Sequence, residues 1–323
     1  LGAAAVLTAA TALGLAAPAA WAQAYPAKAI RFIVPYPPGG GTDIVARMIA
    51  PRMAQGLGQT VLIDNKPGGG GVAGAVAVRN APADGHTLFI GHVGTHAIDI
   101  HLHSKLGYDP VADFTPISSF MSFLSLLVVP ANSPARNFAE LVALAKSKPG
   151  GLSFASQGHG TAGHFLGEMM KTATGAPMVH IPMKGGAPAV QSLIAGDTQV
   201  IFGTSPVVLP QVRGGRVRPL AITTQERSDA IPNIMGMKEA GLAEYNISFS
   251  FGLYAPMKTP PDDLKKIFDA AVKVLKRQDI REKLATQGMD PLPNNSPNEF
   301  RLQNQREAPL WSKLIEASGA KVD

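Results

Sequence analysis

Five glycine-rich turns recur along this chain, each between a short apolar run and a segment with helical periodicity. Short β-branched runs are typical of buried strands, and the segments that follow them have the spacing of amphipathic helices. Strands that alternate with helices build a parallel sheet with helices on its faces. The pattern therefore predicts an α/β fold, with turns at residues 37–43, 66–71, 156–163, 183–188 and 202–206.

The alternation divides into two units in series. In the first unit we expect strands at 29–36, 60–65 and 86–93, with a helix at 43–56 and a short helix that follows the glycine turn at 66–74 and ends at Asn80. In the second unit, Asn137 and Glu140 have the spacing of a capping box that opens a helix through Lys146. The other elements expected there are strands at 125–130, 152–156, 178–183, 199–204 and 217–224, and helices at 161–173 and 187–196.

The C-terminal part has a strand pattern at 246–256 and then only helical patterns, at 261–279, at 280–287 and from Ser296 onward. Because we expect this helical tail to have no strand partners of its own, it must pack on an existing sheet. If that sheet belongs to the first unit, two segments cross between two lobes.

Two lobes also fit the length, because about 300 residues exceed the usual size of one core. The predicted crossing segments are 125–130 and 246–256. The predicted lobe limits are residues 24–125 plus 250–323 for lobe 1 and residues 126–249 for lobe 2.

The first 22 residues carry no charge and end with Ala20 and Ala22 on either side of Trp21, as in an A-x-A cleavage site. This pattern is typical of a secretory signal peptide at residues 1–22, with cleavage near Ala22. A membrane anchor is the alternative, but the apolar stretch is short and Pro18 interrupts it. We therefore expect an exported, periplasmic protein without membrane insertion.

The composition narrows the possible functions. The chain has no cysteine, which excludes disulfides, thiolate metal sites and cysteine nucleophiles. Its net charge of +6 comes from scattered residues, and only 6% of the residues are aromatic. Nucleic-acid binding usually needs clustered basic residues, so we expect no nucleic-acid partner.

The glycine-rich turns suit an anionic ligand. In open α/β sheets the ligand crevice lies beyond the carboxyl ends of the strands. Helix N-termini at that edge present free N–H groups and about half a positive charge each. Glycine has no Cβ to keep an anion away from these amides, so the turns favour a carboxylate, phosphate or sulfate.

Three other kinds of site are weaker alternatives. Residues 158–163 match G-x-G-x-x-G, but the next strand has no acidic residue for a ribose. Four histidines in residues 91–103 have some metal-like spacings, but no single element would bring all four together, so we expect no metal there. We expect instead that this run is a loop in which one or two polar groups, at Gly94 and Thr95, face the ligand. The chain also lacks the common hydrolase motifs, and it is not expected to be an enzyme.

Several segments together resemble the Bug (TctC) family of periplasmic receptors for tripartite tricarboxylate transporters. The resemblance runs from about residue 25 to the C-terminus, and it is carried by segments such as YPPGGGTD, IDNKPGGGGVAG, ADGHTLFIG, HIPMKGG and RPLAITTQERSDAIP. It implies a type II periplasmic-binding-protein fold, in which two lobes close on a small organic carboxylate without chemistry or cofactor. It also implies a monomer that delivers its ligand to transporter membrane subunits or signals to a sensor kinase. An exported hydrolase is a weaker alternative.

The resemblance also implies ligand-binding residues. The first carboxylate loop corresponds to Tyr36–Asp43, and the opposing contacts correspond to the SQGHGT, KGG and GTS turns. Two residues depart from the family pattern. Met183 stands where the family usually has a tyrosine, and Phe251 stands where the family commonly has a tryptophan or tyrosine. Both changes remove polar groups, which favours a ligand with a less polar body. The expected ligand-binding residues are Tyr36, Pro38, Gly39, Gly40, Thr42, Asp43, Gly94, Thr95, Ser156, His159, Gly160, Thr161, Lys184, Gly185, Gly186, Thr204 and Ser205.

Overall fold

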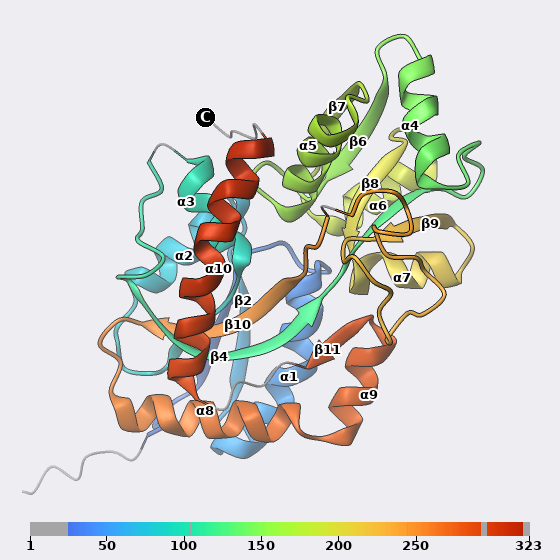
Figure 1. The fold of residues 1–323 in the computed structure, drawn as a ribbon. Helices are drawn as coiled ribbons and strands as arrows, with labels where there is room; N and C mark the ends of the chain where they lie inside the picture. The colour runs from blue at the N-terminus through green and yellow to red at the C-terminus, as the bar shows by residue number, and fades with distance from the viewer. Residues whose placement is uncertain (1–24, 104, 244, 292–295, 319–323) are drawn as a thin grey trace, which may run out of the picture.

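Two α/β lobes, each built around one mixed sheet, make up the protein (Figure 1). A computed structural model describes residues 25–103, 105–243, 245–291 and 296–318. The signal peptide expected at residues 1–22 lies outside the described residues. Within the described ranges, no helix combines the length and the apolar character needed to cross a membrane.

The sheet of lobe 1 has six strands. They are β1 (Ile30–Val34), β2 (Val61–Asn65), β3 (Thr87–His92), β4 (Phe114–Phe123), β10 (Phe249–Pro256) and β11 (Met289–Pro291). Their order across the sheet is β11-β4-β10-β3-β1-β2. β1 pairs in parallel with β2 and β3, as the alternation predicts, whereas β10 pairs antiparallel with β3 and β4.

The sheet of lobe 2 repeats this plan with five strands. They are β5 (Ser125–Pro130), β6 (Leu152–Ser156), β7 (Met178–Pro182), β8 (Val200–Thr204) and β9 (Val217–Ile222). The order is β7-β6-β8-β5-β9, with β6 parallel to β7 and β8 and with β5 antiparallel to its neighbours. In each sheet, one antiparallel strand arrives by a crossing from the other lobe: β10 in lobe 1 and β5 in lobe 2.

Helices follow most strands and cover the sheets (Figure 1). Those of lobe 1 and the C-terminal part are α1 (Gly41–Leu57), α2 (Val72–Arg79), α3 (Asp99–Leu102), α8 (Pro261–Leu275), α9 (Gln278–Thr286) and α10 (Pro297–Ser318), with short η1 (Gly69–Gly71) and η2 (Gly94–Ile98). Those of lobe 2 are α4 (Phe138–Ser147), α5 (Ala162–Thr174), α6 (Gly186–Ala195) and α7 (Ser205–Arg213).

The local sequence explains why β1 and α1 pack together. Phe32 and Val34 of β1 are fully buried, and α1 directs Val45, Ile49 and Met53 into the same cluster. These helical residues recur at the spacing of one helix face. Burial of each such side chain contributes about 1.5–3 kcal/mol. This packing fixes the N-terminus of α1 at the carboxyl edge of the sheet.

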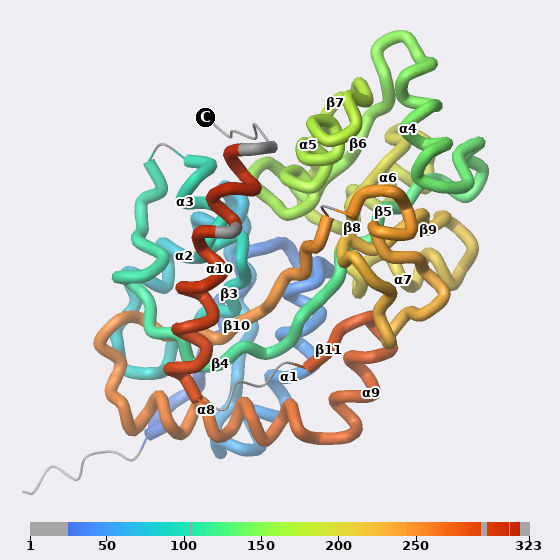
Figure 2. The backbone as a smooth tube through the Cα atoms, in the orientation of Figure 1, coloured from blue at the N-terminus to red at the C-terminus, as the bar shows by residue number. Residues whose placement is uncertain are grey.

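Two segments link the lobes, and they run close together in Figure 2. In the first, Leu124 alone separates β4 from β5. The second leads from Ile247 into β10. Thr223 ties the two together, because its amide donates to the Ser125 carbonyl at 3.0 Å and its carbonyl accepts from the Ile247 amide at 2.8 Å. The lobe limits predicted from the sequence place both segments at a lobe boundary.

The C-terminal helix α10 reaches from lobe 1 to lobe 2. Its Trp311 stacks on Phe249 of β10, with ring centroids 5.5 Å apart, and meets Phe165 of α5 edge-on at 5.9 Å. The Tyr245 hydroxyl donates to the Leu166 carbonyl beside this cluster at 3.1 Å. The hydrophobic core therefore continues across the boundary between the lobes.

The sequence expectations were wrong at three places. The C-terminal tail does contribute a strand, since β11 pairs antiparallel with β4. The ten-residue strand β4 was not foreseen. Residues 94–102, expected as a loop, form η2 and α3. Elsewhere the expected strands and helices are present, with ends that shift by a few residues.

Candidate functional site

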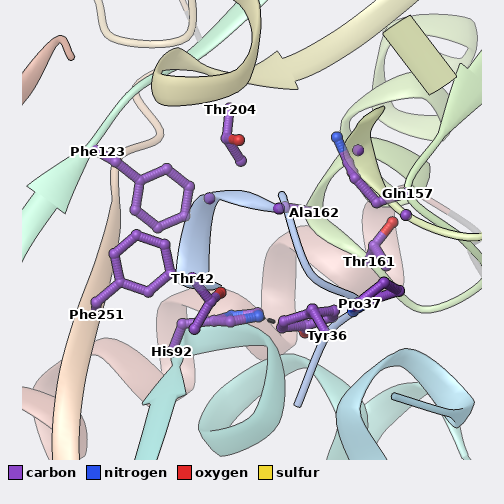
Figure 3. A pocket seen from close by; sticks show the side chains of 14 residues that line it. Tyr36, Pro37, Thr42, His92, Phe123, Gln157, Thr161, Ala162, Thr204 and Phe251 are labelled. Atoms are coloured by element: carbon purple, nitrogen blue, oxygen red, sulfur yellow. Dashed lines mark hydrogen bonds between the residues drawn. The ribbon is translucent and has the colours of Figure 1, made fainter. Parts of the chain in front are cut away.

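A pocket lies between the two lobes, where helix N-termini from both face one another (Figure 3). It encloses about 500 Å³ of space, part of which is continuous with solvent. The residues that line it are Tyr36, Pro37, Gly40, Gly41, Thr42, His92, Phe123, Gln157, Thr161, Ala162, Gly185, Gly186, Thr204 and Phe251.

Four helices begin at this pocket. The residues that precede their first turns all line it: Gly40 for α1, Thr161 for α5, Gly185 for α6 and Thr204 for α7. One helix comes from lobe 1 and three come from lobe 2. Each N-terminus carries a partial positive charge that favours an anion by about 0.3–1 kcal/mol, or up to about 2 kcal/mol in a partly buried site.

Three of these helix ends, those of α1, α5 and α6, keep unused donors, whereas in α7 the Ser205 amide donates to the Leu124 carbonyl at 2.8 Å and Pro206 has no N–H. None of the four has a hydrogen bond from a side-chain cap. Within the described part of the chain, the amides that precede Ile44 in α1 have no backbone acceptor, and the Ile44 amide is the first to donate, to the Gly40 carbonyl. In α5 the first is Phe165, which donates to Thr161, and in α6 it is Ala189, which donates to Gly185. Free amides are therefore available from both lobes.

The pocket has no charged side chain among its lining residues. One wall is aromatic, because Phe123 of β4 and Phe251 of β10 stack with centroids 4.3 Å apart and planes inclined by 20° (Figure 3). Both rings are almost fully buried. The pocket thus combines amide donors for an anionic group with an apolar wall for a hydrocarbon body.

Tyr36 and His92 form the floor in a chain of hydrogen bonds (Figure 3). Their rings stack at 5.0 Å, and the Tyr36 hydroxyl is hydrogen-bonded to Nε2 of His92. That hydroxyl donates to the Gly70 carbonyl at 2.6 Å, and the Gly94 amide donates to Nδ1 of His92 at 2.6 Å. His92 must therefore be the neutral Nε2–H tautomer that donates to Tyr36.

Burial supports this protonation state. It lowers the pKa of His92 to about 3 and raises the pKa of Tyr36 well above its ordinary value. Both groups are therefore neutral at physiological pH. The chain of hydrogen bonds joins three loops that follow strands in lobe 1, and it orients the Tyr36 ring toward the pocket without adding charge.

A wider outer groove adjoins the pocket. Tyr36, Pro37, Gln157, Thr161 and Gly185 line both spaces. The residues that line only the groove are Pro35, Pro67, Gly68, Gly69, Gly70, Gly71, Gly158, His159, Pro182, Met183 and Lys184. The glycine-rich loop at 67–71 of lobe 1 therefore faces the 157–159 and 182–185 turns of lobe 2.

The lobes approach closely around the pocket. A Cβ on Gly41 would lie 3.0 Å from Oγ1 of Thr204, and one on Gly70, where φ is +69°, would lie 3.1 Å from the His159 carbonyl oxygen. A Cβ on Gly185 would lie 3.2 Å from Pro37. Glycine at these turns allows the backbones of the two lobes to meet, which corresponds to a closed arrangement.

The residues expected from the sequence fall into three groups. Those in the pocket are Tyr36, Gly40, Thr42, Thr161, Gly185, Gly186 and Thr204, and those only in the outer groove are His159 and Lys184. The others line neither space: Pro38, Gly39, Asp43, Gly94, Thr95, Ser156, Gly160 and Ser205.

Asp43 supports the first loop from within. Its carboxylate accepts from the Gly39 amide and from Arg47, both at 2.9 Å, and from Asn65 at 3.0 Å. Burial acts to raise the pKa of Asp43, but these hydrogen bonds outweigh it and hold that pKa below its usual range. Thr95 has a similar supporting role, because its buried hydroxyl donates to the His92 carbonyl at 3.0 Å.

Seven lining residues were not among the expected ligand-binding residues: Pro37, Gly41, His92, Phe123, Gln157, Ala162 and Phe251. Pro37 and Gly41 do lie in the predicted loop Tyr36–Asp43, and Gln157 lies in the predicted SQGHGT turn. Gly41 and Ala162 stand next to predicted positions and could have been found from the helix starts. Phe123 lies on the strand that was not foreseen. Of the two departures noted in the sequence, Phe251 lies in the pocket and Met183 in the outer groove.

One pair of side chains resembles part of a hydrolase site. Oγ of Ser156 is 2.7 Å from Nε2 of His180. Ser156 is fully buried, lines neither the pocket nor the groove, and also hydrogen-bonds Gly158. Among the described residues, no carboxylate hydrogen-bonds His180. A nucleophilic serine needs a base that is oriented by a third group, so this pair lacks the arrangement of a catalytic triad.

Comparison with known proteins places this arrangement among transport receptors. The model of the family described as "Tripartite tricarboxylate transporter family receptor" (TctC) matches residues 45–320. Protein BugT of Bordetella pertussis is 34% identical over 310 residues, which cover 96% of this chain and 94% of BugT. A solved structure described as a periplasmic transporter is 38% identical, with a TM-score of 0.89 over 93% of this chain and 100% of that one.

Two similar structures contain a carboxylate. Rpa4515 of R. palustris with adipate is 31% identical, with a TM-score of 0.88 over 92% of this chain and 100% of that one. MatC of Rhodopseudomonas palustris with bound malate is 30% identical, with a TM-score of 0.85 over 90% of this chain and 100% of that one. The shared architecture is that of a two-lobed periplasmic binding protein.

Proposed function

The chain belongs to the tripartite tricarboxylate transporter receptor family of solute-binding proteins, and from this premise we propose that it captures a small organic carboxylate between its lobes. Capture takes place in the periplasm, and the loaded protein delivers the carboxylate to the membrane subunits of a tripartite tricarboxylate transporter. The periplasmic binding proteins among its structural neighbours support this location.

The observation that carries the proposal is the convergence of four uncapped helix N-termini on one pocket without charged side chains. A carboxylate accepts several N–H groups at once, and charge-assisted bonds of this kind are roughly twice as strong as neutral ones. Because the donors come from both lobes, a bound carboxylate stabilises the closed arrangement. Gly40 and Gly185 keep side chains away from the ligand at two of these ends.

The aromatic wall supports a ligand with an apolar body. The stacked rings of Phe123 and Phe251 offer no hydrogen bonds, so a ligand hydroxyl group placed against them would stay unpaired. We therefore expect aliphatic or aromatic acids to bind at least as well as citrate. The adipate in one relative and the malate in another make dicarboxylates the first compounds to test.

The test is a panel of ligands measured by thermal unfolding at neutral pH. Binding at a hundredfold excess over Kd adds about 2.7 kcal/mol to the free energy of unfolding, which raises the melting temperature by a few degrees. Adipate, malate and citrate should be compared with the dimethyl esters of the first two. Shifts for acids and none for esters are expected, and equal shifts for an acid and its ester would contradict the anion site.

Delivery needs a separate test. Cells that lack either this chain or the membrane subunits of the transporter should both lose uptake of the radiolabelled acid that gives the largest shift. Normal uptake without the membrane subunits would contradict delivery but leave the binding function intact.

A further inference from the structure

Three histidines of lobe 2 gather beside the outer groove. His159 stands in the loop after β6, His164 in the first turn of α5 and His180 on β7. One ring nitrogen of each lies within 4.8 Å of one ring nitrogen of both others. His164 is buried, His180 is half-buried and His159 is exposed, so the cluster has one side open to solvent.

The rings face one another closely. His164 and His180 stack with centroids 4.1 Å apart, and His159 stands edge-on to them at 5.6 and 5.1 Å. Phe154 also stacks on His180, with centroids 4.9 Å apart. Packing therefore keeps two of the rings next to each other and leaves the third to complete or open the cluster.

Hydrogen bonds orient the two inner rings. The hydroxyl of Ser156 donates to the Gly158 carbonyl at 2.9 Å, so its oxygen accepts from Nε2–H of His180 at 2.7 Å. This tautomer leaves the lone pair of His180 on Nδ1. Ser156 is thus the kind of outer partner that accepts the second N–H of a histidine ligand in metal sites. The Gly160 amide donates to Nδ1 of His164 at 3.3 Å, a long hydrogen bond that an ion bound to that nitrogen would replace.

The inner rings stay neutral, as metal ligands must. Burial, together with the neighbouring histidines and Lys171, lowers the pKa of His180 to about 3. Burial also lowers the pKa of His164, while Glu168 acts in the opposite direction. Glu168 is itself paired with Lys171 at 2.7 Å.

We propose that His159, His164 and His180 bind one divalent transition-metal ion of the Zn²⁺ class. Imidazole is a preferred ligand of zinc, copper and nickel. Zinc–nitrogen bonds are about 2.0–2.1 Å long, so the nitrogens must draw together around the ion. His159 is exposed and stands between two glycines, so its ring can approach the other two. An imidazole binds a metal ion in the plane of its ring, so the stacked rings of His164 and His180 must also turn until their lone pairs face the ion. Three protein ligands leave a fourth position for water or a carboxylate oxygen.

The site is separate from the proposed carboxylate pocket. None of the three histidines lines that pocket, and only His159 lines the outer groove. All three belong to one lobe, so the inference holds whether or not the lobes close on a carboxylate. It goes beyond the proposed function, and a failed metal test would not affect that function.

The experiment titrates Zn²⁺ into the untagged, chelator-treated protein in competition with a chromophoric chelator, and Co²⁺ into a second sample. We expect one equivalent of Zn²⁺ per chain and the visible spectrum of four-coordinate Co²⁺. His159→Ala should weaken Zn²⁺ binding at least about tenfold. Because His159 is exposed, this variant should keep its far-UV circular dichroism and melting temperature.

The matched control is His101→Ala, which removes an exposed histidine of α3 that is outside the cluster. It should bind Zn²⁺ with the affinity of the unaltered chain. The proposal is overturned if the unaltered chain binds no Zn²⁺, if His159→Ala binds it equally well, or if bound Co²⁺ has the weak spectrum of a six-coordinate, water-rich ion.

Discussion

The closest approach between the lobes at the pocket predicts that Gly41→Val weakens ligand binding. Gly41 is the first residue of α1, and a Cβ there would lie 3.0 Å from Oγ1 of Thr204 and 3.3 Å from Cγ of Pro206, both in the opposite lobe. The backbone at Gly41 is helical, so a side chain causes no strain within lobe 1. The added atoms therefore act mainly on the closed arrangement.

The magnitude follows from the cost of overpacking. Extra methyl groups in a well-packed contact typically cost about 1–3 kcal/mol. Because 1.4 kcal/mol corresponds to a tenfold change in affinity, Kd should rise by roughly fivefold to 150-fold. Gly41→Ala places only a Cβ at the contact and should have a smaller effect in the same direction.

The assay is isothermal titration calorimetry with the acid that gives the largest thermal shift. Gly56→Ala is the control, because it lies in the same helix and its Cβ would make only an ordinary contact, 3.7 Å from Ala270. The control should bind as the unaltered chain does. If Gly41→Val binds with unchanged Kd and the same radius of gyration when loaded, the closed contact does not govern binding.

Three further predictions concern a pocket hydroxyl, the Tyr36 hydroxyl and two buried histidines. Thr204→Val keeps the shape of the pocket but removes a hydroxyl donor. A lost hydrogen bond to a charged group costs about 1.5–3 kcal/mol, so calorimetry should show Kd rising roughly tenfold to 150-fold. An unchanged Kd would mean that Thr204 does not contact the ligand. Tyr36→Phe leaves the Gly70 carbonyl and Nε2–H of His92 unpaired, which should lower the free energy of unfolding, measured in urea, by about 1–3 kcal/mol. An unchanged free energy of unfolding would contradict the chain of hydrogen bonds. Burial lowers the pKa of both His92 and His96 to about 3, so as the pH falls the unfolded chain takes up protons before the folded chain does. The free energy of unfolding should therefore fall as pH decreases from about 6.5 toward 3, by up to about 1.4 kcal/mol per pH unit for each histidine. Urea unfolding at a series of pH values measures this, and a constant free energy of unfolding between pH 7 and 5 would contradict it.

The sequence was most informative where one local signal was sufficient. Each glycine-rich turn lies between an apolar strand and an amphipathic helix, and both periodicities can be read within about ten residues. Four of the five predicted turns lead to the helix N-termini at the pocket, and the fifth, at 66–71, lines the outer groove. The edge of the sheet at which they meet follows from parallel pairing alone.

The sequence was least informative where contacts between distant parts of the chain determine which strands form and where their side chains lie. Strand β4 contains Pro116 and several serines, so its pattern does not alternate, yet Ser118 and Ser119 are fully buried. Its Phe123 reaches the pocket only because β4 pairs with β10, which is more than a hundred residues away. The histidine-rich run at 91–103 was weighed as one group, but His92 faces the pocket while His96 stacks on Tyr254 at 3.7 Å.

The contact of α10 with lobe 2 has a mechanical consequence. Two short links alone would let the lobes bend, twist and slide with respect to each other. Contacts of Trp311 with Phe249 and Phe165 add an attachment beside those links, and the Ser205 hydroxyl donates to the Gly288 carbonyl across the same boundary at 2.9 Å. We expect these neighbouring attachments to restrict relative motion of the lobes mainly to one rotation, about an axis that passes near them. A ligand that binds between the lobes then has to stop one rotation rather than several independent motions, so less orientational entropy is lost when the lobes close.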